Sequence, residues 1–174
     1  MHLIERVKLI KLAIFDVDGV LTSGGIVYGA GGAEYKVFHV HDGFGIKLLQ
    51  KAGIEVAIIT AKISASAAAR VADLGITHFY QGQENKIPAY EDIKKKLQLA
   101  DQQVAYMGDD FPDLPLLRRV GFAVTVPNAP DVMREYANYI TTCQAGQGAV
   151  REVCDFILKA QDQYSKVLHA YLCL

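Results

Sequence analysis

The sequence lacks the features that define several large classes of protein. Lysine and arginine total 18 against 19 aspartate and glutamate residues, so no basic excess is present to bind nucleic acid. No apolar run approaches the roughly 18 residues of a membrane-spanning helix, and the first residues do not have the order of a signal peptide. Three cysteines are too few and too scattered for a disulfide framework or a zinc site. We therefore expect a cytoplasmic protein whose partners are neither nucleic acids nor membranes.

What is present is a globular composition with a regular alternation of elements. The 174 residues are 51% hydrophobic and 21% charged, which fits a single domain over 1–174 with a sizeable core. Strand-like runs alternate with helix-like segments, as is typical of parallel βαβ units. We expect strands at 11–16, 55–60, 77–80, 104–108, 122–126 and 139–141. We expect helices at 43–52, 64–74, 85–97, 113–120, 131–136 and 149–161. The predicted fold is an α/β three-layer sandwich around a doubly wound parallel sheet.

Two segments fall outside this alternation. Residues 24–41 contain strand-like stretches at 26–28 and 34–40 joined by a glycine-rich turn, which is typical of a β-hairpin. Because the hairpin directly follows the first strand, we expect it to form a flap beside the functional site. The alternative is a surface connection. The tail at 162–174 is either a frayed helix or an apolar segment that docks on the core or on a neighbouring subunit.

The most informative feature is a pair of acids at the end of the first apolar run. Asp16 and Asp18 follow this run with Val17 between them, and side chains alternate along a strand, so both carboxylates point the same way. They lie at the carboxyl edge of the predicted sheet, where open α/β folds bind ligands. Two carboxylates this close repel unless a cation or a shared proton relieves them. The pair therefore indicates a metal site, a nucleophile beside a general acid/base, or both.

Further polar residues are predicted at the same edge of the sheet. Thr60 ends the second strand, Lys86 opens the helix after the third, and the fourth is followed by Asp109, Asp110 and Asp113. Simple structural alternatives are a strand end for Thr60, a solvated position for Lys86 and a helix N-cap for Asp113. Each feature alone is weak, but their order and placement together are specific.

These features, in this order, resemble the pattern of the haloacid dehalogenase superfamily of phosphotransferases. The resemblance implies that Asp16 attacks phosphorus to form an aspartyl-phosphate. It implies that Asp18 is a general acid and then a general base. Thr60 would donate to a phosphoryl oxygen, and Lys86 would neutralise charge on the phosphoryl group and on Asp16.

The resemblance also implies a magnesium site. A hard divalent cation such as Mg²⁺ suits an all-oxygen set of carboxylates, phosphate and water. Asp16, Asp109 and the backbone carbonyl of Asp18 would hold the ion. Asp110 and Asp113 would support the site as outer ligands or helix caps.

Members of this superfamily often cover the site with a separate cap domain. Here a helix, a strand and a loop separate Thr60 from Lys86, and the hairpin alone separates Asp18 from Asp42, so the chain has no cap of its own. Water exclusion strengthens electrostatic catalysis, so a large substrate or neighbouring subunits must cover the site. We expect oligomerisation through the hairpin, with the tail at 162–174 as a further candidate contact.

A closer resemblance covers nearly the whole chain. The stretches 16–22, 42–47, 80–86 and 146–154 resemble the 3-deoxy-D-manno-octulosonate 8-phosphate (KDO 8-phosphate) phosphatase family. That resemblance implies a Mg²⁺-dependent homotetramer in which a neighbour's hairpin roofs each site. It implies a sugar-acid phosphate substrate in lipopolysaccharide biosynthesis, and it places Lys62, Arg70 and Gly43 near that substrate. A solvated helix position is the alternative for Arg70.

Departures from this family bear on specificity. After the second strand the family reads Ile-Thr-Gly-Arg, whereas this chain has Ile59-Thr60-Ala61-Lys62. The lysine keeps the positive charge but lacks the bidentate fork of arginine. A related nonulosonate 9-phosphate phosphatase carries an acid at this position, so the positive Lys62 favours KDO 8-phosphate. His39 and His41 replace the usual asparagine and arginine. The alternatives are a nonulosonate 9-phosphate phosphatase, a non-catalytic phosphate-binding domain, and a phosphatase acting on protein or polymer.

Overall fold

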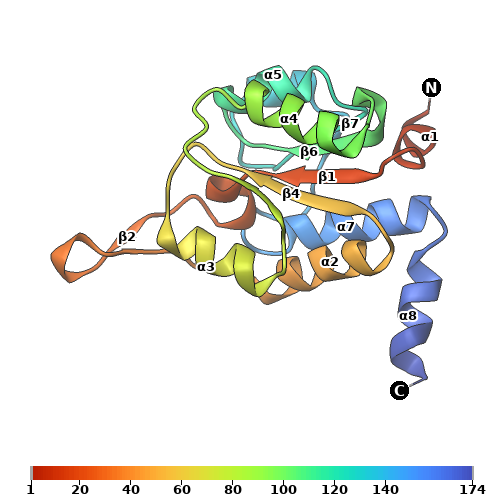
Figure 1. Ribbon diagram of the computed structural model, residues 1–174, viewed down its shortest axis with the longest axis horizontal. Helices are drawn as coiled ribbons and strands as arrows, with labels where there is room; N and C mark the ends of the chain where they lie inside the picture. The colour runs from red at the N-terminus through yellow and green to blue at the C-terminus, as the bar shows by residue number, and fades with distance from the viewer. Residues whose placement is uncertain (1, 174) are drawn as a thin grey trace.

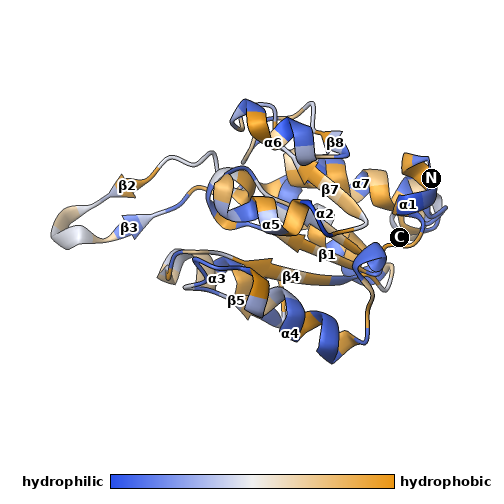
Figure 2. Ribbon diagram, turned by 90° about the horizontal axis from the view of Figure 1, so that it is seen from above, coloured by the Kyte–Doolittle hydropathy of each residue, from blue (hydrophilic) through white to orange (hydrophobic). Residues whose placement is uncertain are grey.

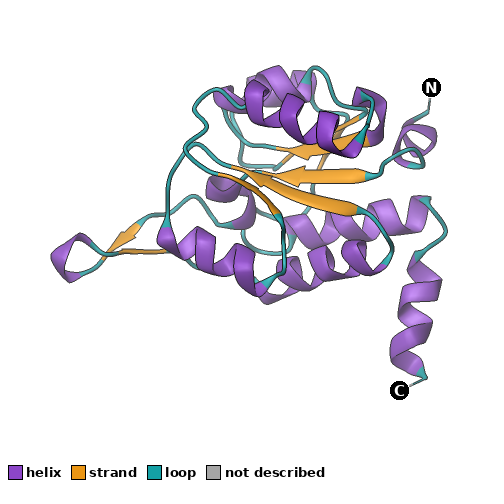
Figure 3. Ribbon diagram, viewed as in Figure 1, coloured by secondary structure: helices purple, strands orange, loops and turns teal. Residues whose placement is uncertain are grey.

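The computed structural model describes residues 2–173, and its centre is a six-stranded parallel sheet (Figures 1 and 3). The strands are β1 Leu12–Phe15, β4 Glu55–Ile59, β5 His78–Tyr80, β6 Val104–Met107, β7 Phe122–Thr125 and β8 Tyr139–Ile140. Their order in the sheet is β5-β4-β1-β6-β7-β8. The predicted doubly wound α/β fold is confirmed, and each predicted strand end lies within one residue of the observed one.

Helices cover both faces of this sheet. The helices of the described residues are α1 Leu3–Val7, α2 Val40–Lys51, α3 Ala65–Asp73, α4 Ile87–Leu97, α5 Leu114–Leu117, α6 Asp131–Tyr136, α7 Ala149–Ala160 and α8 Tyr164–Leu172, and not all of them lie on the sheet. Figure 1 shows α4 and α5 on one face and α2, α3 and α7 on the other. The strands between them are the most hydrophobic part of the chain (Figure 2), and Ile14, Ile58, Tyr106 and Phe122 are 0% exposed. Burial of these side chains stabilises the three layers by roughly 1.5–3 kcal/mol for each aliphatic or phenylalanine side chain.

The strand order determines where the functional residues meet. β1 lies between β4 and β6, and Phe15 pairs in register with Ile58 and with Met107. The chain therefore leaves all three strands at one edge, at the point where the winding of the sheet reverses. Such a switch point opens a crevice between the diverging loops.

The hairpin is present, but its second strand is shorter than predicted. β2 Val27–Tyr28 pairs with β3 Glu34–Tyr35, and the pair projects from the body of the molecule (Figure 1). The strand predicted at 34–40 ends at Tyr35 because β2 offers only two residues for pairing. The apolar pattern that continues through Val37 and Val40 does not reflect strand pairing, since these side chains are 77% and 76% exposed.

The helix predicted at 43–52 begins earlier than expected, at Val40. His39 is consequently its N-cap and His41 lies in its first turn, so neither histidine belongs to the hairpin strands. The helix predicted at 113–120 is also shorter, because a 3-10 turn over Phe111–Asp113 takes its first residue and the chain after Leu117 forms a turn that leads to β7.

The tail forms helix α8, which contacts its own chain. The Tyr171 ring meets Phe44 of α2 edge-to-face at 5.6 Å, and its hydroxyl accepts a hydrogen bond from Lys51 Nζ at 2.6 Å. α8 therefore docks on α2 within one protomer. In the described part of the chain, no helix combines the length and apolar character needed to cross a membrane.

Candidate active site

The loop after β1 brings two distant segments of the chain together. Asp16 follows β1, and its backbone N–H donates to the carbonyl of Met107 at 3.1 Å. Gly19 has a φ of +87°, and a Cβ added there would lie 2.0 Å from Oδ2 of Asp109. Any larger residue would be strained in this conformation and would displace that carboxylate. Gly19 thus allows the Asp109 carboxylate to lie against the loop.

A third segment closes on the same loop from the carboxyl-terminal half of the chain. The backbone N–H of Gly146 donates to the Val20 carbonyl at 3.1 Å. A Cβ at Gly146 would lie 2.6 Å from the backbone nitrogen of Ser23. Buried Asp42 supports this contact, because its Oδ1 accepts from the backbone N–H of Arg151 in the first turn of α7 at 2.8 Å.

Three carboxylates converge beneath the loop. Asp16, Asp109 and Asp113 each offer an oxygen within 4.8 Å of the others. Burial, reinforced by Asp113 and opposed by Lys86, raises the pKa of Asp16 to about 6. Burial together with the charges of Asp16 and Asp113 raises the pKa of Asp109 to about 7. The cluster holds more negative charge than its single lysine neutralises.

A divalent cation fits this cluster. The donors are hard carboxylate oxygens, which Mg²⁺ prefers, and a cation would remove the repulsion that raises the pKa values of Asp16 and Asp109. The Asp18 carboxylate lies outside this cluster, so its predicted contact with the metal rests on its backbone carbonyl alone. The assignment of individual metal ligands remains a prediction.

Lys86 is the buried cation beside Asp16. Its side chain is 3% exposed, and its Nζ lies 2.8 Å from Oδ1 of Asp16 and 2.5 Å from Oδ1 of Asp113. Burial works to lower the pKa of this ammonium, but the two carboxylates outweigh it and raise the pKa above its ordinary value. The alternative of a solvated helix lysine is therefore wrong. An ammonium donor held beside Asp16 suits the binding of a phosphoryl group.

Asp113 holds several groups of the site in place through hydrogen bonds to both of its carboxylate oxygens. Its Oδ1 accepts hydrogen bonds from Lys86 and from the Tyr106 hydroxyl at 2.5 Å, and its Oδ2 accepts from the backbone N–H groups of Asp109 and Asp110 at 2.9 and 3.2 Å. Its side chain makes no capping hydrogen bond to α5, but the bond from the Asp110 N–H closes a capping box on the 3-10 turn Phe111–Asp113. A capping role is therefore present, and it accounts for Oδ2 but not for the contacts of Oδ1 with Lys86 and Tyr106. Gly108 permits this packing, because a Cβ there would lie 2.4 Å from Cγ of Asp113.

Sequence reasoning missed two residues of this network. Tyr106 is 0% exposed and donates to Asp113, and a tyrosine within a buried strand was the available signal, since a buried hydroxyl requires a partner. Lys36 contacts the Asp18 carboxylate at 2.5 Å. No local pattern identifies Lys36, because its partner lies 18 positions earlier in the chain.

One cavity of about 160 Å³ unites the predicted residues. Its lining includes Asp16, Asp18, Thr60, Lys62, Lys86, Asp109, Asp110 and Asp113. Arg70 and Gly43 do not line it. They lie against each other, with Arg70 donating to the carbonyl of His39 at 3.4 Å and to Asp73 at 2.9 Å.

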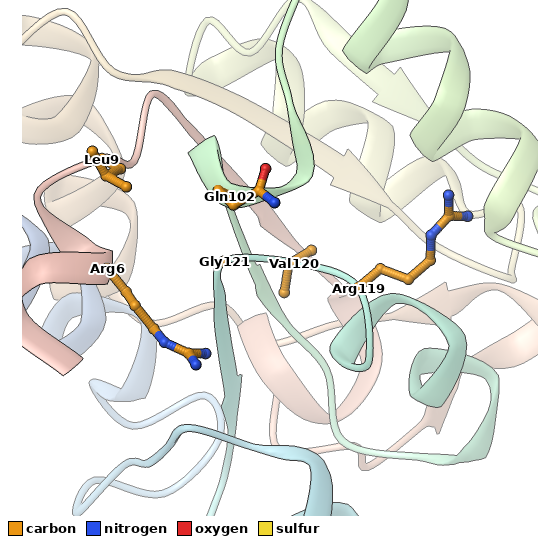
Figure 4. Close-up of a pocket in the computed structure, with 6 residues that line it drawn as sticks. All are labelled: Arg6, Leu9, Gln102, Arg119, Val120 and Gly121. Atoms are coloured by element: carbon orange, nitrogen blue, oxygen red, sulfur yellow. The ribbon is translucent and has the colours of Figure 1, made fainter. Parts of the chain in front are cut away.

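A second cavity, of about 270 Å³, lies at the other end of the strands, where the chain enters β1, β6 and β7 (Figure 4). Arg6 and Arg119 line it, but Figure 4 shows the Arg119 side chain extending away from Arg6. Arg119 instead donates to Glu91 at 2.5 Å. Because its charged groups do not converge, this cavity lacks the chemistry of the carboxylate site.

Fold and site together define a class of protein. A doubly wound sheet with an aspartate pair after β1, a threonine after β4, a lysine at the start of α4 and Gly-Asp-Asp after β6 is the arrangement of a haloacid dehalogenase-like phosphotransferase. Residues 74–153 match the family described as haloacid dehalogenase-like hydrolase.

Similarity to individual proteins extends over almost the whole chain. The KDO 8-phosphate phosphatase of Escherichia coli K12 is 48% identical over 158 residues, covering 91% of this chain and 84% of that protein. The Salmonella typhi protein of the same name is 46% identical over 160 residues, covering 92% and 85%. The chain belongs to the KDO 8-phosphate phosphatase family.

Solved structures agree with this assignment. A haloacid dehalogenase superfamily hydrolase (subfamily III A) from Legionella pneumophila superposes with a TM-score of 0.95 at 49% identity, covering 99% of this chain and 94% of that one. The Moraxella catarrhalis KDO 8-phosphate phosphatase, solved with magnesium, phosphate and KDO, superposes with a TM-score of 0.94 at 44% identity and 97% coverage of both chains.

Proposed function

We propose that this protein is a magnesium-dependent phosphatase that hydrolyses KDO 8-phosphate to KDO and inorganic phosphate in lipopolysaccharide biosynthesis. The observation that carries the proposal is the buried carboxylate cluster with Lys86 against Asp16, in a chain 46–48% identical to phosphatases of that name. The Moraxella structure supports it, because that relative binds magnesium, phosphate and KDO together.

The first half of the reaction transfers the phosphoryl group to the protein. A carboxylate oxygen of Asp16 attacks phosphorus, and the bond between phosphorus and the sugar oxygen breaks. Asp18 gives its proton to that oxygen, which leaves as the alcohol of KDO. Lys86 and Thr60 stabilise the charge on the phosphoryl oxygens. Asp16, Asp109 and the Asp18 carbonyl would hold Mg²⁺, which would supply further neutralisation of this charge when bound.

The second half releases phosphate. Asp18, now a carboxylate, takes a proton from a water molecule that attacks phosphorus. The bond from phosphorus to the Asp16 oxygen breaks, inorganic phosphate leaves, and both aspartates return to their starting protonation states. The ion pair with Asp113 holds the Lys86 ammonium in place beside Asp16.

Lys62 gives the mouth of the cavity a positive charge. It is exposed and lines the cavity beyond Thr60. A carboxylate on the substrate would be attracted to it, with less geometric constraint than an arginine would impose. This charge supports an acidic sugar phosphate as substrate. Arg70 and Gly43 do not line the cavity of a single protomer. In this proposal they lie near the sugar end of the substrate once neighbouring protomers complete the pocket.

Substrate preference is tested by comparing phosphate release from KDO 8-phosphate, a nonulosonate 9-phosphate and a phosphopeptide. We expect kcat/KM for KDO 8-phosphate to be higher by about tenfold or more, a typical discrimination for small differences in substrate structure. Addition of EDTA should abolish release, and excess Mg²⁺ should restore it. Faster hydrolysis of the nonulosonate ester, or no release with Mg²⁺ present, would contradict the proposal.

We further propose a cytoplasmic homotetramer in which the hairpin of one protomer roofs the site of a neighbour. The hairpin exposes apolar side chains that a lone protomer would leave in water: Val27, Tyr28, Tyr35 and Val37 are 54%, 69%, 58% and 77% exposed. Several exposed apolar side chains on one projecting segment are typical of an interface. A roof would also exclude water from a site that has no cap.

A charge on the hairpin tests this assembly. We expect Tyr28→Asp to elute as a smaller species in gel filtration, and to lower kcat/KM by about tenfold or more through loss of the covered site. Ile4→Asp is the matched control, because Ile4 is 53% exposed on α1 at the far end of the molecule from the hairpin (Figure 1). A tetramer that persists in Tyr28→Asp, or an equal effect of Ile4→Asp, would rule out the hairpin contact.

A further inference from the structure

A lysine of the hairpin reaches the side of the active site where Asp18 lies. Lys36 follows β3, and its side chain is 1% exposed. Its Nζ lies 2.5 Å from Oδ1 of Asp18 and 3.0 Å from Oε1 of Glu34. A buried ammonium is costly unless it is paired, so these two carboxylates account for its burial and fix its position.

Glu34 is in turn held by two serines near the start of α3. Its Oε1 accepts a hydrogen bond from the Ser64 hydroxyl at 3.0 Å, and its backbone carbonyl accepts one from the Ser66 hydroxyl at 3.0 Å. Ser64 is also the N-cap of α3, where its Oγ accepts from the backbone N–H of Ala67 at 3.3 Å. The base of the hairpin is thus fastened to a helix, and Lys36 is held by a rigid part of the fold.

The two oxygens of Asp18 have different surroundings. Asp18 lines the cavity and its side chain is 21% exposed, whereas Lys36 does not line the cavity. Oδ1 accepts from Lys36, and across residues 2–173 no hydrogen bond reaches Oδ2. A group that gives a proton to a leaving oxygen and takes one from water needs one oxygen free and its orientation fixed.

We propose that Lys36 is a positioning residue for the reaction, holding Asp18 by Oδ1 so that Oδ2 exchanges the proton. The proposal rests on the proposed function, in which Asp18 is the acid/base. When Asp18 carries the proton on Oδ2, Oδ1 still accepts from Lys36, and Glu34 still balances the lysine charge. The hairpin therefore acts on the site of its own protomer as well as on that of a neighbour.

The positioning role of Lys36 can be tested with two esters, because only one of them needs a general acid to release its alcohol. The alcohol of KDO 8-phosphate must be protonated as it leaves, whereas 4-nitrophenyl phosphate releases a stable phenolate. For Lys36→Met we expect kcat/KM to fall about 30-fold with the sugar ester, a part of the roughly 10²–10⁴-fold that acid–base catalysis contributes. With the nitrophenyl ester the fall should be less than about threefold, because positioning of the acid no longer matters.

Three comparisons separate positioning from a general effect on folding. Lys36→Arg keeps a cation between Asp18 and Glu34 and should restore most of the lost rate. In an Asp18→Asn background, Lys36→Met should have no further effect on the sugar ester. Lys94→Met is the matched control, because this 12% exposed lysine pairs with Asp101 and Glu91 away from the cavity. It should leave both rates unchanged.

The outcomes distinguish this proposal from the proposed function. Equal losses with both esters, or a further loss in the Asp18→Asn background, would show that Lys36 only maintains the fold and would overturn the proposal. A wild-type protein active on 4-nitrophenyl phosphate but not on KDO 8-phosphate would overturn the proposed function alone. Phenyl phosphate would then serve as the ester that needs the acid. A wild type inactive on every ester would overturn both.

Discussion

Asp16→Asn is expected to abolish phosphate release from KDO 8-phosphate, with a fall in kcat of about 10⁴-fold or more, as for other enzymes that lose their nucleophile. The amide cannot form the acyl phosphate on which both halves of the proposed reaction depend. Phosphate release in single-turnover and steady-state experiments measures the effect. Retained turnover would remove Asp16 from the role of nucleophile.

The same variant should remain folded. Because burial raises the pKa of Asp16 to about 6, the ionised carboxylate at neutral pH opposes folding when no metal is bound. Asparagine has nearly the same shape and carries no charge, so the thermal midpoint in metal-free buffer should be no lower than that of the wild type. A large fall in the thermal midpoint would mean that the lost activity reflects lost structure. The loss of activity would then no longer support Asp16 as the nucleophile.

Lys86→Met is expected to damage both activity and stability. Activity should fall by about 10²–10³-fold, the effect of removing a preorganised charge from a transition state. The variant leaves Asp16 and Asp113 buried without their shared cation. Breaking a buried ion pair from one side costs about 3–5 kcal/mol, measured as the free energy of unfolding in denaturant.

The stability loss should depend on pH in a defined direction. Loss of Lys86 removes the charge that opposes the upward shift of the Asp16 pKa. A carboxyl whose pKa is raised by folding favours the folded state at low pH, and this contribution disappears as the pH rises through the folded pKa. The Lys86→Met protein should therefore lose more stability at about pH 8 than at about pH 5. Lys94→Met, which breaks a pair away from the cavity, should not follow this profile. A loss equal at both values would contradict the coupling.

The sheet was predictable because its strands are apolar runs with clear ends. The first and fourth apolar runs stop at residues that a buried strand disfavours, Asp16 after Phe15 and Gly108 after Met107. The parallel order follows from the alternation of strands and helices. The order in turn implied that residues after β1, β4 and β6 would meet, and the structure places Asp16, Thr60 and Asp109 around one cavity.

The parts that sequence did not predict depend on contacts between distant residues. Tyr106 and Lys36 look like ordinary strand and hairpin positions, and only the folded chain brings them to Asp113 and Asp18. The length of β3 was overestimated because alternating apolar residues suggested pairing beyond Tyr35, where no partner strand is available. The roles of the site residues and their metal contacts remain predictions that the variants above test.

The contacts of the loop after β1 also bear on the stage of translation at which the protein can become active. It is held by Lys36 through Asp18, packs on Asp109 at Gly19, and accepts the backbone N–H of Gly146. A nascent chain that has emerged as far as Asp113 already carries every residue of the proposed chemistry. Its first loop nevertheless lacks the Gly146 contact and the strands β7 and β8 that complete the sheet. Domains fold as units as they leave the ribosome, so we expect hydrolytic activity to arise late in translation, and a chain that ends before Gly146 should be inactive although it carries all the catalytic groups.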